Sequence, residues 1–306
     1  MNGIINVYKE QGFTSHDVVA KLRGILQMKK IGHTGTLDPD AVGVLPVCLG
    51  KGTRLVDMIT DCGKTYEAVM LLGKITDTQD ISGEVLESRP VQVSEVDVMD
   101  VCNSFVGEYD QIPPMYSAIK HNGHKLYELA RKGIEVERKP RRITIKSLHI
   151  NEINLEDENK TVTFTVECSK GTYIRTLCQD IGEKLGCGAC MQKLTRTRVG
   201  QFGIDDSLTL NQISALCLKG EFEDHVIPVD EMFPSYKKLT VLDEFAKLLY
   251  NGNKFGTNAV KQTEELEFLD MEMYRIYDEK GRFIGIYRYD CGQFCLVKMF
   301  FDSSEL

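Results

Sequence analysis

The chain has 306 residues, of which 42% are hydrophobic and 27% charged, and its formal net charge is −8. These proportions are typical of a folded globular protein of one or two domains, and they exclude a disordered or collagen-like chain. The sequence contains no run of about 18 apolar residues that could cross a membrane, and its first residues lack the apolar core of a signal peptide. We therefore expect a cytoplasmic protein without a membrane partner.

The ten cysteines are expected to be reduced thiols, because nothing in the sequence marks the chain for export. Cys187 and Cys190 form one close pair, and Cys291 and Cys295 form another about a hundred residues away. A structural zinc site needs two such pairs at short separation, or a matching pair of histidines. We therefore predict no metal site.

The negative charge is unevenly distributed. Residues 1–204 are neutral overall, so residues 205–306 carry the whole net charge. Within the neutral part, residues 115–146 hold nine basic and three acidic side chains, interleaved with tyrosine and histidine. A solvated charged face is the commoner meaning of such a run, but cations beside flat rings are also what unpaired RNA bases and phosphates bind.

Strand and helix patterns alternate irregularly in the first hundred residues. A β-rich run at residues 3–8 predicts a strand, and a capping box at residues 14–17 predicts the start of a helix. Residues 31–54 contain several glycines and two prolines, so we expect a loop or tight turns there. A second strand is predicted at residues 66–74, and a second helix is predicted to begin after Ser94.

The middle of the chain indicates an antiparallel strand pair followed by a helix. Residues 124–132 predict a short helix, which Gly133 ends. Apolar residues then alternate over residues 143–150 and 162–168, and the period changes to that of a helix that reaches Leu185. Because no regular strand–helix–strand units occur, the sequence predicts the α+β class, with a mixed, mainly antiparallel sheet flanked by helices.

The pattern of predicted elements changes near residue 237. A helix is predicted over residues 241–250, and short alternating strands follow at residues 273–276, 283–289 and 293–300. This spacing is typical of a small β-barrel. We therefore predict a main domain over residues 1–236 and a second domain over residues 237–306.

One loop brings two carboxylates together with a proline. Asp38 and Asp40 flank Pro39, which is common turn chemistry, but the neighbouring residues are mainly apolar. A carboxylate in such surroundings needs a cationic partner, and Arg175 at a helix start is a candidate. Two carboxylates two residues apart point in different directions, which disfavours an acid–base pair from this loop alone. Arg175 could also be an ordinary surface arginine. A third candidate, Tyr66, could simply be half-buried in a sheet.

Five stretches in the same order resemble the motifs of one family. They are GHTGTLDPDAVGVLPVCLGKGTRL, KTYEAVMLLG, QIPPMYSAIKHNGHKLYELARKG, SKGTYIRTLCQDIG and LTRTRVGQF, and the match runs over residues 3–204. They closely resemble the signatures of the TruB family, the bacterial tRNA pseudouridine-55 synthases. The family usually has Lys-Pro where this chain has Lys9-Glu10. The C-terminal strands resemble the PUA RNA-binding module of these enzymes.

The resemblance implies a pseudouridine synthase fold and a cofactor-free isomerisation. The N-glycosidic bond of one uridine in the tRNA T-loop (position 55) breaks, the uracil rotates, and a carbon–carbon bond forms to the same ribose. Asp38 matches the essential aspartate of the family, which attacks either ribose carbon 1 or uracil carbon 6. Arg175 matches the arginine that pairs with it. Tyr66 matches the tyrosine that stacks on the base and accepts the proton from carbon 5.

Other positions match residues that bind the substrate. The resemblance implies that Lys9 faces RNA phosphate, that His33 helps to open the T-loop, and that Tyr173 and Leu194 line the base pocket. The segment at about residues 112–146 matches a basic insertion that closes over the T-loop. The cations expected to contact RNA there are Lys120, Lys125, Arg131, Lys132, Arg141 and Arg142.

Two alternatives come from other classes of protein. A non-catalytic RNA-binding or RNA-folding protein could share the scaffold, but it would have no chemical use for Asp38, Tyr66 and Arg175 together. A glycosidase with two carboxylates would leave the basic insertion unexplained. The leading prediction is therefore a monomeric tRNA-modifying enzyme without a cofactor, whose partner is the tRNA T-stem-loop. Whether it modifies other RNAs stays open.

Overall fold

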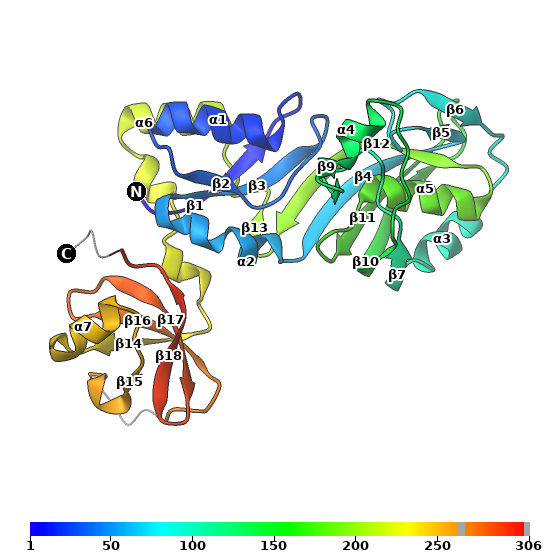
Figure 1. Ribbon diagram of the computed structural model, residues 1–306. Helices are drawn as coiled ribbons and strands as arrows, with labels where there is room; N and C mark the ends of the chain where they lie inside the picture. Colours follow the sequence, from blue (N-terminus) through cyan, green and yellow to red (C-terminus); the bar gives the residue numbers. More distant parts are fainter. Residues whose placement is uncertain (262–266, 303–306) are drawn as a thin grey trace.

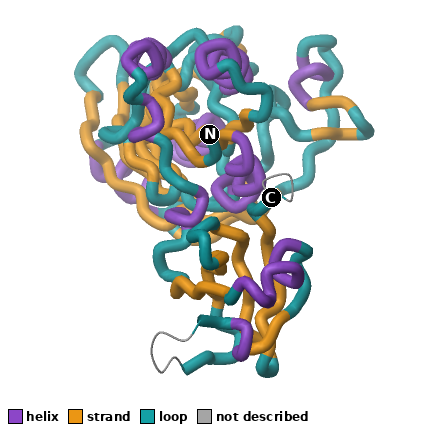
Figure 2. The backbone as a smooth tube through the Cα atoms, turned by 90° about the vertical axis from the view of Figure 1, so that its left-hand side faces the viewer, coloured by secondary structure: helices purple, strands orange, loops and turns teal. Residues whose placement is uncertain are grey.

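The computed structural model describes residues 1–261 and 267–302. A nine-stranded sheet forms the centre of the large domain, and a five-stranded sheet forms a smaller C-terminal lobe, which Figure 2 shows below the rest of the molecule. In the large sheet the order is β1-β3-β12-β4-β11-β10-β7, with β2 paired to β3 and β13 paired to β12. These strands are β1 (Gly3–Lys9), β2 (Ile31–His33), β3 (Val42–Leu49), β4 (Lys64–Leu72), β7 (Gly107–Gln111), β10 (Arg141–Asn154), β11 (Thr161–Cys168), β12 (Ala189–Val199) and β13 (Phe202–Gly203).

Helices cover the large sheet in two groups (Figure 1). Helices α1 (Ser15–Leu26) and α6 (Leu210–Lys219) pack side by side at the end formed by β1 and β3. Helices α3 (Glu95–Asn103) and α5 (Ile174–Leu185) cover the other end, where they share an apolar core with β4, β10, β11 and β12. The remaining elements of this domain are short: α2 (Val56–Thr60), α4 (Leu126–Ala130), the hairpin of β5 (Lys74–Thr76) and β6 (Val85–Ser88), and the hairpin of β8 (Lys120–His121) and β9 (His124–Lys125).

The predicted α+β class with a mixed, mainly antiparallel sheet is confirmed. Within the large sheet only β3 and β12 run parallel in the described structure. The capping box at residues 14–17 is formed as predicted, since the Thr14 side chain accepts from the Asp17 backbone and the Asp17 carboxylate accepts from the Thr14 backbone. The alternating stretches in the middle of the chain are β10 and β11, paired antiparallel.

The prediction of a loop or tight turns over residues 31–54 holds for residues 34–41 and is wrong for the residues on either side of them. This stretch contains β2 and β3, and β3 is almost wholly buried beside β1 and β12. Its glycines permit close strand approach instead of breaking the chain. At Gly43, with φ of 107°, an added Cβ would lie 2.2 Å from the carbonyl oxygen of Arg196 on β12.

Strand β12 received no prediction, although it lies at the centre of the sheet. Its register against β4 shifts twice, between Met191 and Lys193 and between Arg196 and Arg198. Each shift reverses which residues face the core, so the simple alternation that marks a strand is lost in the sequence.

The C-terminal lobe is a curled sheet in the order β14-β16-β17-β18-β15. Its elements are β14 (Lys237–Val241), α7 (Ala246–Tyr250), β15 (Phe255–Gly256), β16 (Met273–Asp278), β17 (Phe283–Asp290) and β18 (Gln293–Met299). The predicted helix over residues 241–250 is wrong only at its start, because Val241 is buried at the end of β14; a 3-10 helix (Asp243–Phe245) then leads into α7. The lobe packs on the large domain through an apolar cluster that joins Ile4 and Val44 to Ile286 and Phe300.

Candidate active site

Asp38 lies in a tight turn in the segment that connects β2 to β3. The Ala41 backbone N–H donates to the Asp38 carbonyl at 3.1 Å, which closes the turn around Pro39. The Leu37 backbone N–H donates to the Ser15 hydroxyl at the start of α1, at 2.9 Å. The turn chemistry of the Asp-Pro sequence is therefore present, and it serves to fix the backbone on which the Asp38 carboxylate is mounted.

Lys9 forms a hydrogen bond to the backbone of the same turn. Its side chain is fully buried, and its ammonium donates to the Pro39 carbonyl at 3.1 Å and to the Glu10 carbonyl at 3.2 Å. Burial lowers the pKa of Lys9 from 10.5 to about 8, while the charges of Asp38 and Asp40 oppose that shift. The ammonium thus faces carbonyl groups of its own chain, and its predicted contact with RNA phosphate stays a prediction.

Arg175 forms a two-point ion pair with Asp38. The Arg175 Nε lies 3.0 Å from Asp38 Oδ2, and its Nη2 donates to Asp38 Oδ1 at 3.2 Å. Only 6% of the Arg175 side chain is accessible, against 39% of the Asp38 side chain. The arginine is therefore part of the core of α5, and the carboxylate remains open toward a substrate on its free side. Folding brings these two residues together from positions 137 apart in the chain.

Arg175 also donates to two backbone carbonyls. Its Nη1 donates to the Thr78 carbonyl at 3.0 Å, and its Nη2 also donates to the Tyr116 carbonyl at 2.8 Å. Asp80 lies at the edge of the same cluster, with one oxygen 3.8 Å from Arg175 Nε. The guanidinium is thus fixed from three directions before any substrate binds.

Burial and the partner arginine act on the Asp38 carboxyl in opposite directions, and burial has the larger effect. Burial raises the pKa of the Asp38 carboxyl above its ordinary value, Arg175 counteracts this rise, and Asp80 adds to it. Arg175 therefore favours the ionised form of Asp38, as expected from the sequence for an aspartate paired with an arginine.

Tyr66 lies on β4 in the same core cluster as Leu37 and Leu194, and only 7% of it is exposed. Burial raises the pKa of the Tyr66 hydroxyl; Arg196 lowers it, and the nearby Asp38 carboxylate raises it further. The structure therefore brings Asp38, Arg175 and Tyr66 to one place.

The predicted pocket residues lie around this group. Leu194 on β12 is buried beside Ala68 of β4. Tyr173 immediately precedes α5, and the buried Gln111 side chain holds its backbone: the Tyr173 N–H donates to Gln111 Oε1 at 2.8 Å, and Gln111 Nε2 donates to the Tyr173 carbonyl at 3.1 Å. His33 is half-buried on β2, its Nδ1 accepts from the Gly35 N–H, and burial lowers its pKa, which favours the neutral ring.

The basic segment is exposed and adjoins the ion pair. In Figure 1 the hairpin β8–β9 and α4 lie in front of the middle of the sheet, between α1 and α5. Five of its predicted RNA-binding cations are exposed: Lys120, Arg131, Lys132, Arg141 and Arg142. Lys125 is half-buried, and its ammonium and the Arg131 guanidinium each lie over the Tyr127 ring. Arg142 already pairs with Glu108 and Asp110.

Comparison with known proteins decides the family. The model of the TruB family pseudouridylate synthase (N terminal domain) matches residues 23–174, and that of the tRNA pseudouridylate synthase B C-terminal domain matches residues 175–234. The chain belongs to the TruB family. A tRNA pseudouridine synthase B of Clostridium perfringens (strain SM101 / Type A) is 47% identical over 99% of this chain and 100% of its own length. One of Lachnoclostridium phytofermentans is 53% identical over 98% of this chain and 100% of its own length.

Solved structures agree with this TruB-family assignment. A crystal structure of a Cbf5-Nop10-Gar1 complex has a chain 28% identical to this one, with a TM-score of 0.70, over 99% of this chain and 86% of that chain. An H/ACA RNP bound to a substrate RNA containing 2'-deoxyuridine has a chain 26% identical, with a TM-score of 0.69, over 98% and 85%. The predicted family, fold and enzyme class, a pseudouridine synthase, are thereby confirmed.

Three residues of this TruB-family site were not predicted from the sequence. Asp80, Gln111 and Arg196 each act through contacts with distant segments, and only Gln111 and Arg196 lay within the recognised motifs. A charged side chain on a strand between buried positions, as at Arg196, is the signal that could have drawn attention.

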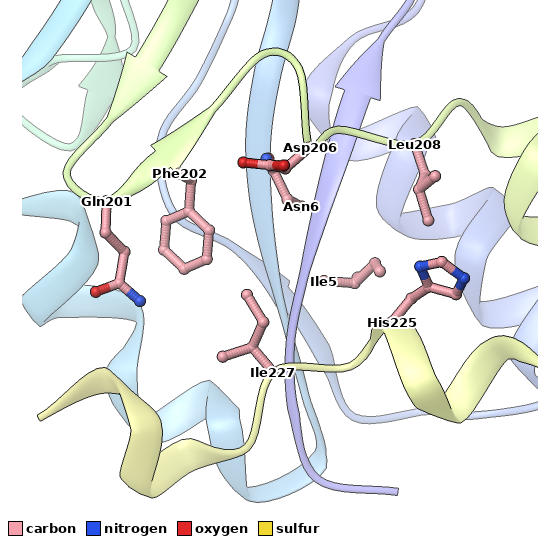
Figure 3. A pocket seen from close by; sticks show the side chains of 8 residues that line it. All are labelled: Ile5, Asn6, Gln201, Phe202, Asp206, Leu208, His225 and Ile227. Atoms are coloured by element: carbon pink, nitrogen blue, oxygen red, sulfur yellow. The ribbon is translucent and has the colours of Figure 1, made fainter. Parts of the chain in front are cut away.

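Other candidate sites are absent or lie elsewhere. Among the described residues, no cluster of three His, Cys, Asp or Glu side chains could hold a metal ion, and no helix is long and apolar enough to span a membrane. A hollow of about 260 Å³ lies between β1, residues 201–208 and residues 225–227 (Figure 3). None of its lining residues belongs to the group around Asp38.

Proposed function

We propose that this tRNA pseudouridine synthase isomerises the uridine at position 55, in the T-loop, and that Asp38 is its nucleophile. The observation that carries the proposal is the two-point contact between Asp38 and Arg175, with Tyr66 beside it. A carboxylate held in one orientation by a cation and accessible on one side is suited to attack a carbon atom of a bound nucleotide.

The reaction is an isomerisation without net oxidation or reduction. The bond between ribose carbon 1 and uracil N1 breaks, and a bond from the same ribose carbon to uracil carbon 5 forms. The proton on carbon 5 is lost, and N1 gains one, so no co-reactant is needed. Asp38 would attack ribose carbon 1 or uracil carbon 6, and in either case the carboxylate is the attacking anion. Tyr66 would stack on the uracil and accept the proton from carbon 5.

The surroundings of the site suit a base that has left the RNA stack. Extrusion of a stacked base costs a few kcal/mol, which contacts to the surrounding RNA must offset. The exposed cations of residues 115–146 are available for phosphate contacts beside the site. Tyr173 and Leu194 would line the base pocket, and His33 would fill part of the space that the base vacates in the T-loop.

A T-stem-loop RNA with tritium at carbon 5 of its uridine tests both parts of the proposal. Formation of pseudouridine releases this tritium, and sequencing of the product shows whether position 55 was changed. Asp38→Asn should bind the RNA with nearly unchanged affinity and release no tritium, because the amide is a poor nucleophile. Normal release by this variant would overturn the nucleophile assignment. Tight RNA binding by the wild-type chain without tritium release would instead favour the non-catalytic RNA-folding alternative.

A further inference from the structure

Arg196 occupies a central position between the two halves of the active site. On β12 its register partner on one side is Gly43 of β3, the strand that follows the Asp38 turn. On the other side its partner is Tyr66 of β4. Directly opposed residues of antiparallel strands project from the same face of the sheet, so the side chains of Arg196 and Tyr66 are neighbours.

The Arg196 side chain is fully buried with few partners. It is 1% exposed, its Nε donates to the Val44 carbonyl at 2.7 Å, and its Nη2 reaches the Gly35 carbonyl at 3.5 Å. No carboxylate in the described part of the chain forms an ion pair with it, and Tyr66 is the titratable group that opposes the lowering of the Arg196 pKa by burial. Three other basic groups lie near enough for Arg196 to lower their pKa values: Lys9, Lys64 and His33.

A buried cation without a carboxylate is costly to keep. Removal of a guanidinium from water costs several kcal/mol, and neutral carbonyl groups return only part of this. An apolar side chain at this central position of β12 would pack without that cost. We therefore expect the positive charge of Arg196 to have a function. The anion that would complement it is a phenolate at Tyr66.

We infer that Arg196 is a positioning residue that orients the Tyr66 hydroxyl and stabilises its phenolate, so that Tyr66 can take the proton from carbon 5 of the uracil. The inference rests on the proposed function, and it names the group that makes this tyrosine a usable base. In the reaction the phenolate oxygen forms a bond to the proton, and the electron pair of the broken carbon–hydrogen bond remains in the uracil ring. Because Arg196 is fully buried, it would act on the reaction through Tyr66.

The charges around Tyr66 support a role of Arg196 in stabilising the Tyr66 phenolate. The groups that face its hydroxyl are Arg196 on β12, Cys168 on β11 and Asp38 in its turn. Burial raises the pKa of Tyr66, Asp38 and Cys168 act in the same direction, and Arg196 is the group that opposes them. Without Arg196, the phenolate would therefore form only at still higher pH.

The test compares Arg196→Gln, Arg196→Lys, Tyr66→Phe and the double variant Arg196→Gln/Tyr66→Phe, with the exposed Arg198→Gln as the matched control. Single-turnover tritium release from the T-stem-loop RNA is measured from about pH 6 to about pH 10. Arg196→Gln should slow release by at least about tenfold at neutral pH, because general-base catalysis typically contributes 10²–10⁴-fold. The deficit should shrink as the pH rises, Arg196→Lys should lose less, and Arg198→Gln should behave as wild type.

The double variant separates a role through Tyr66 from a structural role. If Arg196 acts through Tyr66, the change Arg196→Gln should cost less than about twofold in the Tyr66→Phe background. A loss of equal size in both backgrounds, or a deficit that does not vary with pH, would overturn the inference. Arg196→Lys keeps a charge in the same place, so it carries the test if Arg196→Gln does not fold.

A spectroscopic titration tests the pair without any turnover. The phenolate of Tyr66 is obtained as the ultraviolet difference between the wild type and Tyr66→Phe. Its midpoint should lie at higher pH when the same difference is taken in the Arg196→Gln background, and an unmoved midpoint would contradict the inference. Absence of tritium release by the wild type would refute the proposed function alone, since this titration would still report on Arg196 and Tyr66.

Discussion

The Nη2 of Arg175 donates to the backbone carbonyl of Tyr116 at 2.8 Å, while the same nitrogen contacts Asp38. Tyr116 belongs to the basic segment that we expect to close over RNA, so one guanidinium joins that segment to the proposed nucleophile. Any shift of this segment on RNA binding must therefore preserve or replace a hydrogen bond to Arg175. The contact gives a direct physical route by which the bound RNA could adjust the orientation of Asp38.

Arg175→Lys should slow catalysis far more than it weakens RNA binding. A lysine has one nitrogen where the guanidinium uses three, so it cannot contact both Asp38 oxygens and also the Thr78 and Tyr116 carbonyls. We expect single-turnover tritium release to fall by about 10²-fold, the size typical of the loss of one preorganised electrostatic contact. Filter binding should show a much smaller change in Kd. An unchanged rate would argue against a catalytic role of the ion pair.

Gln111→Ala should lower stability and activity together. The substitution removes the side-chain partner of the Tyr173 N–H, two residues before Arg175, while the Tyr173 carbonyl still accepts from the Leu177 N–H. We expect the free energy of unfolding to fall by ~1 kcal/mol, the usual net loss for a hydrogen bond of this kind. Urea denaturation measures this, with the exposed Gln293→Ala as the control. Equal stability of the two variants would show that Gln111 does not hold the Tyr173 backbone.

Lys9 should make stability depend on pH in a defined window. Its pKa is lowered from 10.5 to about 8 in the folded state, so the native protein releases this proton at lower pH than the unfolded chain does. Between these two values the unfolded chain holds more protons, and the free energy of unfolding must rise with pH. Below about pH 8 the cost of the buried charge is present in full.

Comparison of the wild type with Lys9→Met isolates this contribution. The difference in free energy of unfolding between the two should change in favour of the wild type as the pH rises from about 8 to 10.5, because only the wild type titrates at this position. Lys29→Met, at an exposed position, should show no such trend. A difference that stays constant with pH would contradict the shifted pKa.

Cations of the basic segment should differ in their contribution to RNA affinity. Affinity for the T-stem-loop should fall with added salt, and the loss of one phosphate contact should reduce the slope of log K against log salt by about 0.7–0.9. Lys132→Ala is expected to show this reduction, since Lys132 is exposed and forms no ion pair in the described structure. Arg142→Ala should show less, because Arg142 already pairs with Glu108 and Asp110. A flat salt response of the wild type would contradict phosphate binding by this segment.

Patterns among residues a few positions apart were enough to predict much of the fold. The capping boxes of α1 and α3 and the alternation in β10 and β11 involve residues a few positions apart, so their patterns are visible before folding. The same reasoning failed where glycines serve strand packing, as at Gly43, and where register shifts conceal a strand, as in β12. The motifs predicted the residue types of the site, and the family followed from them.

The sequence by itself thus determined the family, the fold class and the identities of Asp38, Tyr66 and Arg175. Only the tertiary structure decided what surrounds them: that Lys9 supports the Pro39 carbonyl, that Gln111 holds Tyr173, and that Arg196 lies against Tyr66. The reason is physical. Burial and the orientation of a charge depend on segments that lie 30 residues apart for Lys9 and Pro39, 62 for Gln111 and Tyr173, and about 130 for Tyr66 and Arg196, and local sequence pattern carries no record of their contact.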